Sequence, residues 1–156
     1  MWTLDSHSCE LLSDNELEEA ILRTTNRIII LDGPSGCGKT FFLRRLKDKN
    51  RAVRIPIHEV IEKMIKIIKM QEYSTASFSR GLLLDIEEAP IICFDDVDLS
   101  LRAKKAVQTE VASILQTLST KKKIVLAGIR VKEQCEHLMI LINNLGVEYY
   151  YYKKEN

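Results

Sequence analysis

The chain has 156 residues, of which 46% are hydrophobic and 29% are charged, and its formal net charge is +1. These values suit one soluble globular domain with a sizeable core, and the small net charge gives no argument for a nucleic-acid partner. The four cysteines have no disulfide-like spacing, no apolar run is long enough to span a membrane, and the start lacks a signal-peptide pattern. We therefore expect a cytoplasmic protein with reduced thiols and no membrane contact.

The first residues carry little chemistry. His7 and Cys9 could form half of a metal site, but no second cluster completes it. We expect residues 1–12 to be a flexible N-terminal tail and residues 13–156 to be a single domain.

Strand and helix patterns alternate along the rest of the chain. Ser13 and Glu16 have the spacing of a capping box and predict a helix to about Thr24. Further helices are predicted at 39–47, 58–70, 78–86, 102–119 and 132–145. Apolar runs predict strands at 28–31, 52–55, 91–94, 124–127 and 147–152. The first four strands, apart from Arg54, lack polar residues, as strands buried on both faces do. This order predicts an α/β fold, a three-layer αβα sandwich with a five-stranded parallel sheet.

The segment after the first predicted strand carries the most specific motif. Residues 33–40 read G-P-S-G-C-G-K-T and match the Walker A pattern G-x-x-x-x-G-K-T. The motif predicts that residues 13–156 are a single P-loop NTPase domain and that the three-layer αβα sandwich is a P-loop NTPase sandwich. Glycines there allow backbone N–H groups to point inward at a phosphate, next to the positive end of the following helix. We expect Lys39 to be a catalytic residue that reaches the β- and γ-phosphates, and we expect the Thr40 hydroxyl to ligate Mg²⁺. The predicted nucleotide-binding residues are Gly33, Pro34, Ser35, Gly36, Cys37, Gly38, Lys39, Thr40 and Phe41, with ATP or ADP and Mg²⁺ as cofactors.

A second motif follows the strand predicted at 91–94. The acids Asp95 and Asp96 come directly after four apolar residues, which is the Walker B pattern. By position, Asp95 would hold Mg²⁺ directly or through water, and Asp96 would act as the general base that polarises the attacking water. Parallel strands would bring Asp95 to the same sheet edge as Lys39. The competing interpretation is a solvated acidic turn that continues through Asp98.

With these motifs, residues 10–150 resemble the AAA+ ATPase core, and most of all the replication-initiator ATPases of the DnaA family. The resemblance lies in four segments: residues 33–40, V-R-I-P-I-H-E-V-I-E-K at 53–63, I-C-F-D-D-V-D at 92–98, and K-I-V-L-A-G-I-R at 123–130. It implies a sheet with strand order 5-1-4-3-2 and ATP as the nucleotide. It also implies oligomers in which an arginine of one subunit completes the site of its neighbour.

The sequence departs from the family pattern where hydrolysis is controlled. The family carries a polar sensor residue after the fourth strand, where this chain has Ala127-Gly128-Ile129, so Arg130 or Thr120 would have to replace the sensor. No arginine precedes the last strand at the place of the family's arginine finger. No C-terminal lid domain and no DNA-binding domain are expected in residues 1–156. We therefore expect nucleotide binding with slow hydrolysis or none.

Three functions fit these features. The first is an AAA+-like ATP-dependent switch or weak ATPase, whose partner is a protein or a second copy of the chain. A nucleic-acid partner and a link to DNA replication rest on family analogy alone. The second is a small guanylate-kinase-like P-loop kinase, although the arginines that a kinase lid needs are scattered here. The third is a scaffold that binds no nucleotide, against which the intact Lys39, Thr40 and Asp95 argue.

Two surface runs allow two interpretations each. Lys121-Lys122-Lys123 could contact nucleic acid or anionic lipid, or could be a solvated loop that enters a strand. The tyrosines at 149–152 could stack on bases, or could belong to an edge strand whose exposed face serves as a docking patch.

Overall fold

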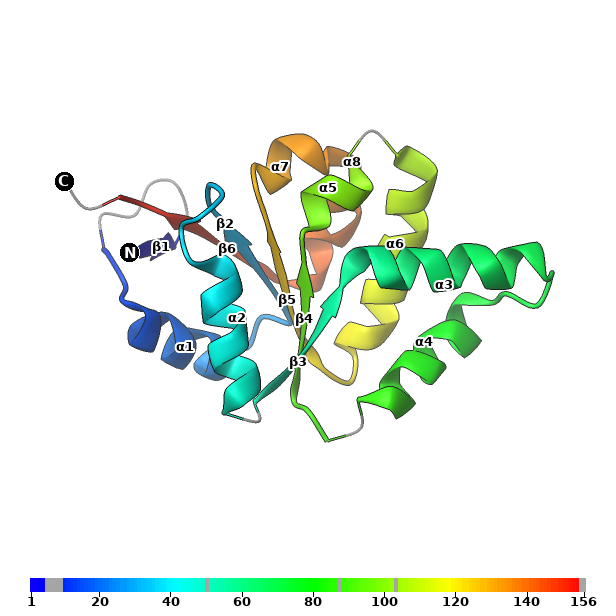
Figure 1. Cartoon of the computed structure of the whole chain (residues 1–156), viewed down its shortest axis with the longest axis horizontal. Helices are drawn as coiled ribbons and strands as arrows, with labels where there is room; N and C mark the ends of the chain where they lie inside the picture. Colours follow the sequence, from blue (N-terminus) through cyan, green and yellow to red (C-terminus); the bar gives the residue numbers. More distant parts are fainter. Residues whose placement is uncertain (5–9, 50, 87, 103, 155–156) are drawn as a thin grey trace.

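A six-stranded sheet separates two layers of helices (Figure 1). The computed structural model describes residues 1–4, 10–49, 51–86, 88–102 and 104–154, so His7 and Cys9 lie outside the described residues. The strands are β1 (Trp2–Leu4), β2 (Ile28–Asp32), β3 (Ala52–Pro56), β4 (Ile91–Asp95), β5 (Lys123–Gly128) and β6 (Val147–Tyr152). The helices are α1 (Asp14–Arg23), α2 (Lys39–Asp48), α3 (Ile57–Lys69), α4 (Thr75–Asp85), α5 (Val97–Leu101), α6 (Lys105–Ser119), α7 (Val131–Gln134) and α8 (Glu136–Ile142), followed by the 3₁₀ turn η1 (Asn143–Leu145).

The strand order is β1-β6-β2-β5-β4-β3. Its last five members are parallel and reproduce the implied order 5-1-4-3-2, which confirms the predicted fold class. Helices cover both faces of the sheet, so alternate side chains of β2 pack into two different hydrophobic cores. Ile28 and Ile30 pack with the helices from α3 to α8, whereas Ile29 and Leu31 pack with α1 and α2. Each described helix is too short or too polar to traverse a bilayer.

Strand β1 is the main difference from the expected sheet. Where the sequence predicts a tail, Trp2–Leu4 pair antiparallel with β6, so the sheet has six strands instead of five. The Trp2 ring is almost fully buried and packs edge-on against Tyr152, 5.4 Å between ring centroids. Its Nε1 donates a hydrogen bond to Asp14 Oδ1 at 3.1 Å. Three residues are too few to show a strand periodicity, so long-range contacts alone define this strand.

One long helix expected from the sequence is divided in the structure. The segment predicted at 132–145 forms α7, α8 and η1, whereas the helix predicted at 102–119 is continuous as α6 from Lys105. Buried Gln108 of α6 joins α5 to α8, because its side chain donates to the Leu101 carbonyl at 2.7 Å and accepts from Leu138 N–H at 2.8 Å. A continuous helical period in the sequence does not reveal such breaks.

The capping box of α1 is confirmed, and the other end of that helix contacts Lys123, the last residue of the lysine run. Ser13 Oγ accepts from Glu16 N–H at 3.2 Å, and Glu16 Oε1 accepts from Ser13 N–H at 3.1 Å. Lys123 Nζ donates to the carbonyl oxygens of Ile21 at 2.7 Å and Thr24 at 2.9 Å. Burial, followed by nearby Arg27, lowers the pKa of the Lys123 ammonium group. Lys123 therefore caps the C-terminal end of α1.

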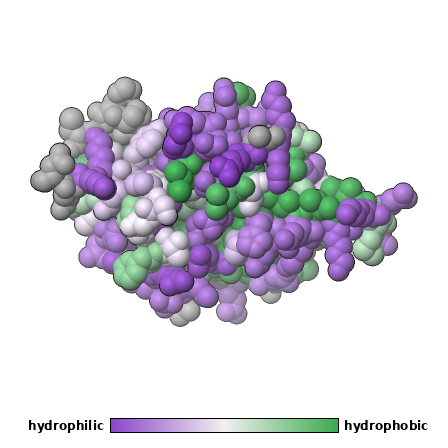
Figure 2. Space-filling view, turned by 45° about the horizontal axis from the view of Figure 1, so that its top comes forward, coloured by the Kyte–Doolittle hydropathy of each residue, from purple (hydrophilic) through white to green (hydrophobic). Residues whose placement is uncertain are grey.

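The buried face of α3 is narrow. Ile61 and Met64 are buried, but Ile65 and Ile68 are 40% and 45% exposed. Figure 2 shows a mostly hydrophilic surface on which hydrophobic side chains gather toward the end of the molecule where α3 protrudes in Figure 1.

If Trp2 anchors β1, then Trp2→Ala should lower the free energy of unfolding by about 3–5 kcal/mol, the usual cost of removing a buried aromatic side chain. Urea unfolding followed by circular dichroism measures this change without relying on tryptophan fluorescence. Leu4→Ala is the matched control, because Leu4 belongs to the same strand and is exposed. Equal effects of the two substitutions would contradict the anchoring role.

Candidate functional site

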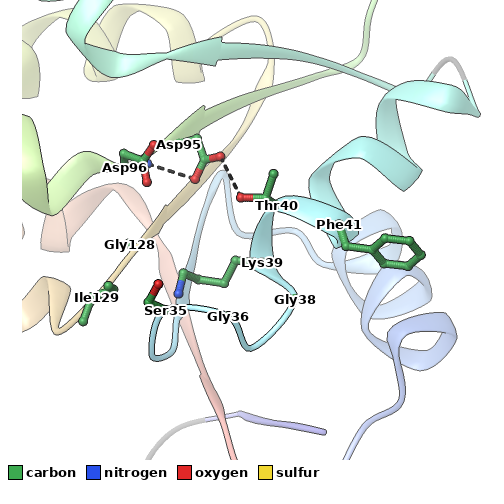
Figure 3. A pocket seen from close by; sticks show the side chains of 10 residues that line it. All are labelled: Ser35, Gly36, Gly38, Lys39, Thr40, Phe41, Asp95, Asp96, Gly128 and Ile129. Atoms are coloured by element: carbon green, nitrogen blue, oxygen red, sulfur yellow. Dashed lines mark hydrogen bonds between the residues drawn. The ribbon is translucent and has the colours of Figure 1, made fainter.

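A cavity of about 270 Å³ lies at the carboxyl ends of β2, β4 and β5 (Figure 3). It brings the two predicted motifs together with the end of β5. Its lining residues are Ser35, Gly36, Gly38, Lys39, Thr40, Phe41, Asp95, Asp96, Gly128 and Ile129. Of the predicted site residues, Gly33, Pro34 and Cys37 do not line it, and they form the loop behind it. The ring of Phe41 points away from the carboxylates and is exposed.

The loop between β2 and α2 takes its shape from glycine. Gly36 and Gly38 have φ angles of 80° and 104°, which lie in the left-handed region that favours glycine. Gly38 is also the N-cap of α2, so the helix begins directly at the cavity. Helix N-termini and successive N–H groups in such loops form sites for anions.

Gly33 is required for a different reason, which is space. A Cβ atom at this position would lie 2.7 Å from Cys37 Sγ and 2.8 Å from Tyr152 Cβ. The loop therefore packs directly on the last residue of β6, which in turn contacts Trp2 of β1. The edge of the sheet supports the loop through these contacts.

Lys39 places its ammonium group inside the loop. Its Nζ donates to the carbonyl oxygens of Gly33 and, at 3.0 Å, of Pro34. Figure 3 shows the side chain extending from the start of α2 toward Ser35. The positive charge is thus held where the loop would surround a phosphate.

The two carboxylates of the second motif differ in environment. Asp95 is only 2% exposed, and its Oδ2 accepts a hydrogen bond from Thr40 Oγ1 at 3.3 Å (Figure 3). Asp96 is exposed, has a left-handed φ of 55°, and donates its N–H to Asp95 Oδ1 at 2.9 Å. Desolvation by surrounding protein atoms raises the pKa of Asp96, and the charges of Asp95 and Asp98 raise it further. One acid is therefore fixed within a network, and the other is exposed at the cavity.

Arg54 was not predicted as a site residue, yet it contacts the site. Its Nη2 and Nε donate to Asp95 Oδ2 at 2.8 Å and 3.2 Å. The sequence signal was a single cation in an otherwise apolar strand. That signal shows an unusual residue but does not show which carboxylate it meets.

The segment that follows β5 is fixed by two other carboxylates. Asp98 Oδ1 accepts from Ile129 N–H at 3.0 Å, and Asp32 accepts from the N–H groups of Arg130 and Val131 at 2.9 Å and 3.0 Å. Gly128 and Ile129 thus present no polar side chain at the position where the resemblance implies a sensor.

Neither substitute considered for the sensor lines the cavity. Thr120 lies before β5, at the amino ends of the parallel strands, and the cavity lies at their carboxyl ends. Its hydroxyl donates a hydrogen bond to the Thr117 carbonyl at 2.7 Å. Arg130 is the N-cap of α7 and has a left-handed φ of 50°.

The side chains in the cavity fit a magnesium–phosphate ligand. The Thr40 hydroxyl and the Asp95 carboxylate place oxygen atoms side by side, and Mg²⁺ in phosphate sites typically takes one or two such protein ligands. Among the described residues, no group of three or more His, Cys, Asp or Glu side chains is placed to hold a metal ion by itself.

Comparison with known proteins agrees with this arrangement. A model of the AAA domain, dynein-related subfamily, matches residues 28–126. No curated protein sequence matches the chain.

Solved structures share the fold at low sequence identity. Domain III of the replication initiation protein DnaA from Thermotoga maritima is 17% identical, with a TM-score of 0.67 over 92% of this chain and 62% of that one. AMPPCP-bound DnaA from Aquifex aeolicus is 21% identical, with a TM-score of 0.62 over 90% and 45%. DnaI is 16% identical, with a TM-score of 0.51 over 89% and 79%. The chain thus spans less than two thirds of the length of either DnaA structure, and its fold is that of the AAA+ core.

The packing at Gly33 leads to a paired prediction. Gly33→Ala should lower the free energy of unfolding by about 1–3 kcal/mol, because the new methyl group overlaps Cys37 and Tyr152. Gly81→Ala should instead raise it by about 0.5–1 kcal/mol, because Gly81 is exposed in α4 with nothing within 4 Å of an added Cβ. Thermal unfolding followed by circular dichroism compares both with wild type. A Gly33→Ala protein as stable as wild type would refute the close packing of the loop.

Proposed function

The chain belongs to the AAA domain family, dynein-related subfamily, and we propose that it binds ATP and ADP with Mg²⁺ as a nucleotide-dependent switch or weak ATPase. The observation that carries this proposal is one cavity that joins the glycine-shaped loop, the ammonium group of Lys39 and the Thr40–Asp95 pair. An anion nest, a fixed cation and metal-binding oxygens are the three components that a nucleotide's phosphates need.

Each residue has a proposed role toward the nucleotide. The loop residues Gly33, Pro34, Ser35, Gly36, Cys37 and Gly38 form the cradle, with Phe41 at its rim. Lys39 would exchange its contacts with the Gly33 and Pro34 carbonyls for the β- and γ-phosphates. Thr40 and Asp95 would hold Mg²⁺, which when bound neutralises charge on the phosphate oxygens. These roles suit phosphates of any nucleotide, so the choice of adenine rests on the similarity to ATP-binding relatives.

Turnover is proposed to be slow. Asp96 lies at the cavity with its pKa raised, so it could accept a proton from an attacking water. Gly128 and Ile129 offer no polar side chain to position that water, and no arginine belongs to the described lining of the cavity. A bound nucleotide would then persist, which suits a switch that changes the affinity for a partner.

The partner proposal is drawn from structural neighbours. DnaA has been solved with AMPPCP and single-stranded DNA at 19% identity to this chain and a TM-score of 0.63. By this likeness, we propose a protein partner, self-association or single-stranded nucleic acid as the target of the switch, in a process linked to DNA replication. Size-exclusion chromatography in ATP and in ADP would reveal nucleotide-driven self-association.

Lys39→Ala should abolish ATP binding, because it removes the charge that opposes the β- and γ-phosphates. Isothermal titration calorimetry with MgATP measures the effect, which we expect to exceed about a hundredfold in Kd. Lys47→Ala is the matched control, since Lys47 is an exposed lysine of the same helix. Unchanged affinity in Lys39→Ala would refute the site.

Asp96→Asn should leave MgATP affinity within about twofold of wild type and lower any hydrolysis by about a hundredfold, the usual contribution of a general base. Phosphate release by purified protein measures hydrolysis, and calorimetry measures affinity. Equal turnover of variant and wild type would show that Asp96 is not the base.

A test of wild-type protein with nucleoside monophosphates separates the switch from a kinase, because rapid transfer of phosphate to a monophosphate would establish the kinase.

A further inference from the structure

The Arg54–Asp95 ion pair occupies the oxygen that the metal would need. Asp95 has two carboxylate oxygens, and Oδ1 accepts from Asp96 N–H at 2.9 Å. The other oxygen, Oδ2, is the one that faces Thr40 Oγ1, the second proposed metal ligand. Both guanidinium contacts of Arg54 are made to this same Oδ2.

Burial makes this pairing necessary. Asp95 lies at the end of a fully buried strand, and a buried carboxylate without a counter-charge is strongly destabilising. Arg54 supplies that charge in the absence of metal, and a guanidinium keeps its charge at every accessible pH. Its own position is fixed, because Arg54 belongs to β3 and aligns with Cys93 of β4, two residues before Asp95.

We propose that Arg54 is a resident counter-ion of Asp95 that Mg²⁺ must displace, so that this positioning residue sets the Mg²⁺ concentration at which the protein binds ATP tightly. This inference rests on the proposed function of the site. Arg54 and Mg²⁺ compete because each would bring positive charge to one oxygen, and the two cations repel each other at such short range. Tight nucleotide binding then requires that the metal replace the guanidinium.

The test is a titration of Mg²⁺ at fixed protein and fixed fluorescent ATP analogue, with nucleotide binding followed by fluorescence anisotropy. Arg54→Gln removes the competing charge but keeps a polar side chain of similar reach. We expect its Mg²⁺ midpoint to fall by about tenfold or more, because a charge-assisted contact usually contributes at least that factor. Arg54→Lys keeps a cation at the same position and should keep the midpoint within about threefold of wild type.

Arg80→Gln is the matched control. It removes the same charge from an exposed position on α4, outside the lining of the cavity, and should leave the midpoint unchanged. If the midpoint of Arg54→Gln equals that of wild type or is higher, the counter-ion proposal is overturned. If wild type itself binds no nucleotide at any Mg²⁺ concentration, the proposed function fails instead, so the two failures are distinguishable.

A measurement on wild-type protein covers the case in which Arg54→Gln does not fold. In ¹⁵N-labelled protein, the Arg54 Nε–H group donates to a carboxylate and should give a protected resonance in metal-free buffer. The resonance is assigned by its loss in Arg54→Lys. Saturating Mg²⁺ and ADP should shift it and accelerate its exchange with water. An Arg54 Nε–H resonance that is unchanged by Mg²⁺ and ADP, in protein that binds ADP by calorimetry, would overturn the proposal.

Discussion

The buried carboxylate of Asp95 is the constraint on which the site depends. Asp95 is the last residue of β4, and its carboxylate accepts hydrogen bonds from Thr40 of α2, from Arg54 of β3 and from the N–H of Asp96. Three separate elements therefore meet at one charged group. Since an isolated buried charge is costly, the sheet order and the start of α2 must remain in register for the carboxylate to keep its partners.

The loop between β2 and α2 has a second support, which comes from the β1–β6 side of the sheet. Gly33 lies against Tyr152 of β6, and Tyr152 lies against Trp2 of β1. Trp2 also packs near Phe42 of α2, at 6.4 Å between ring centroids. Trp2 thus supports the loop through its ring contacts with Tyr152 and Phe42. The tyrosine run that could have stacked on bases belongs to this arrangement, with Tyr149 and Tyr150 buried.

Local signals predicted the capping box at Ser13, the five parallel strands and the edge at which Lys39, Thr40, Asp95 and Asp96 meet, and all are present. The order of the strands was implied by the resemblance to AAA+ ATPases, and it is also present. The division of the helix predicted at 132–145 was missed, because buried Gln108 of α6 accepts from the Leu138 N–H and no local pattern records that contact. Thr120 was considered as a sensor although it precedes the strand predicted at 124–127, and in a parallel sheet this places it at the end of the strand away from the cavity.

The sequence by itself determined the chemistry available: a glycine-rich loop with Lys39 and Thr40, paired acids after an apolar strand, and no polar side chain at Gly128-Ile129. These follow from residue type and short spacing, which a linear pattern retains. The tertiary structure decided that Trp2 extends the sheet, that Lys123 caps α1 and that Arg54 neutralises Asp95. Each of these joins residues far apart in the chain, and burial and charge pairing between distant segments are properties of the folded arrangement alone.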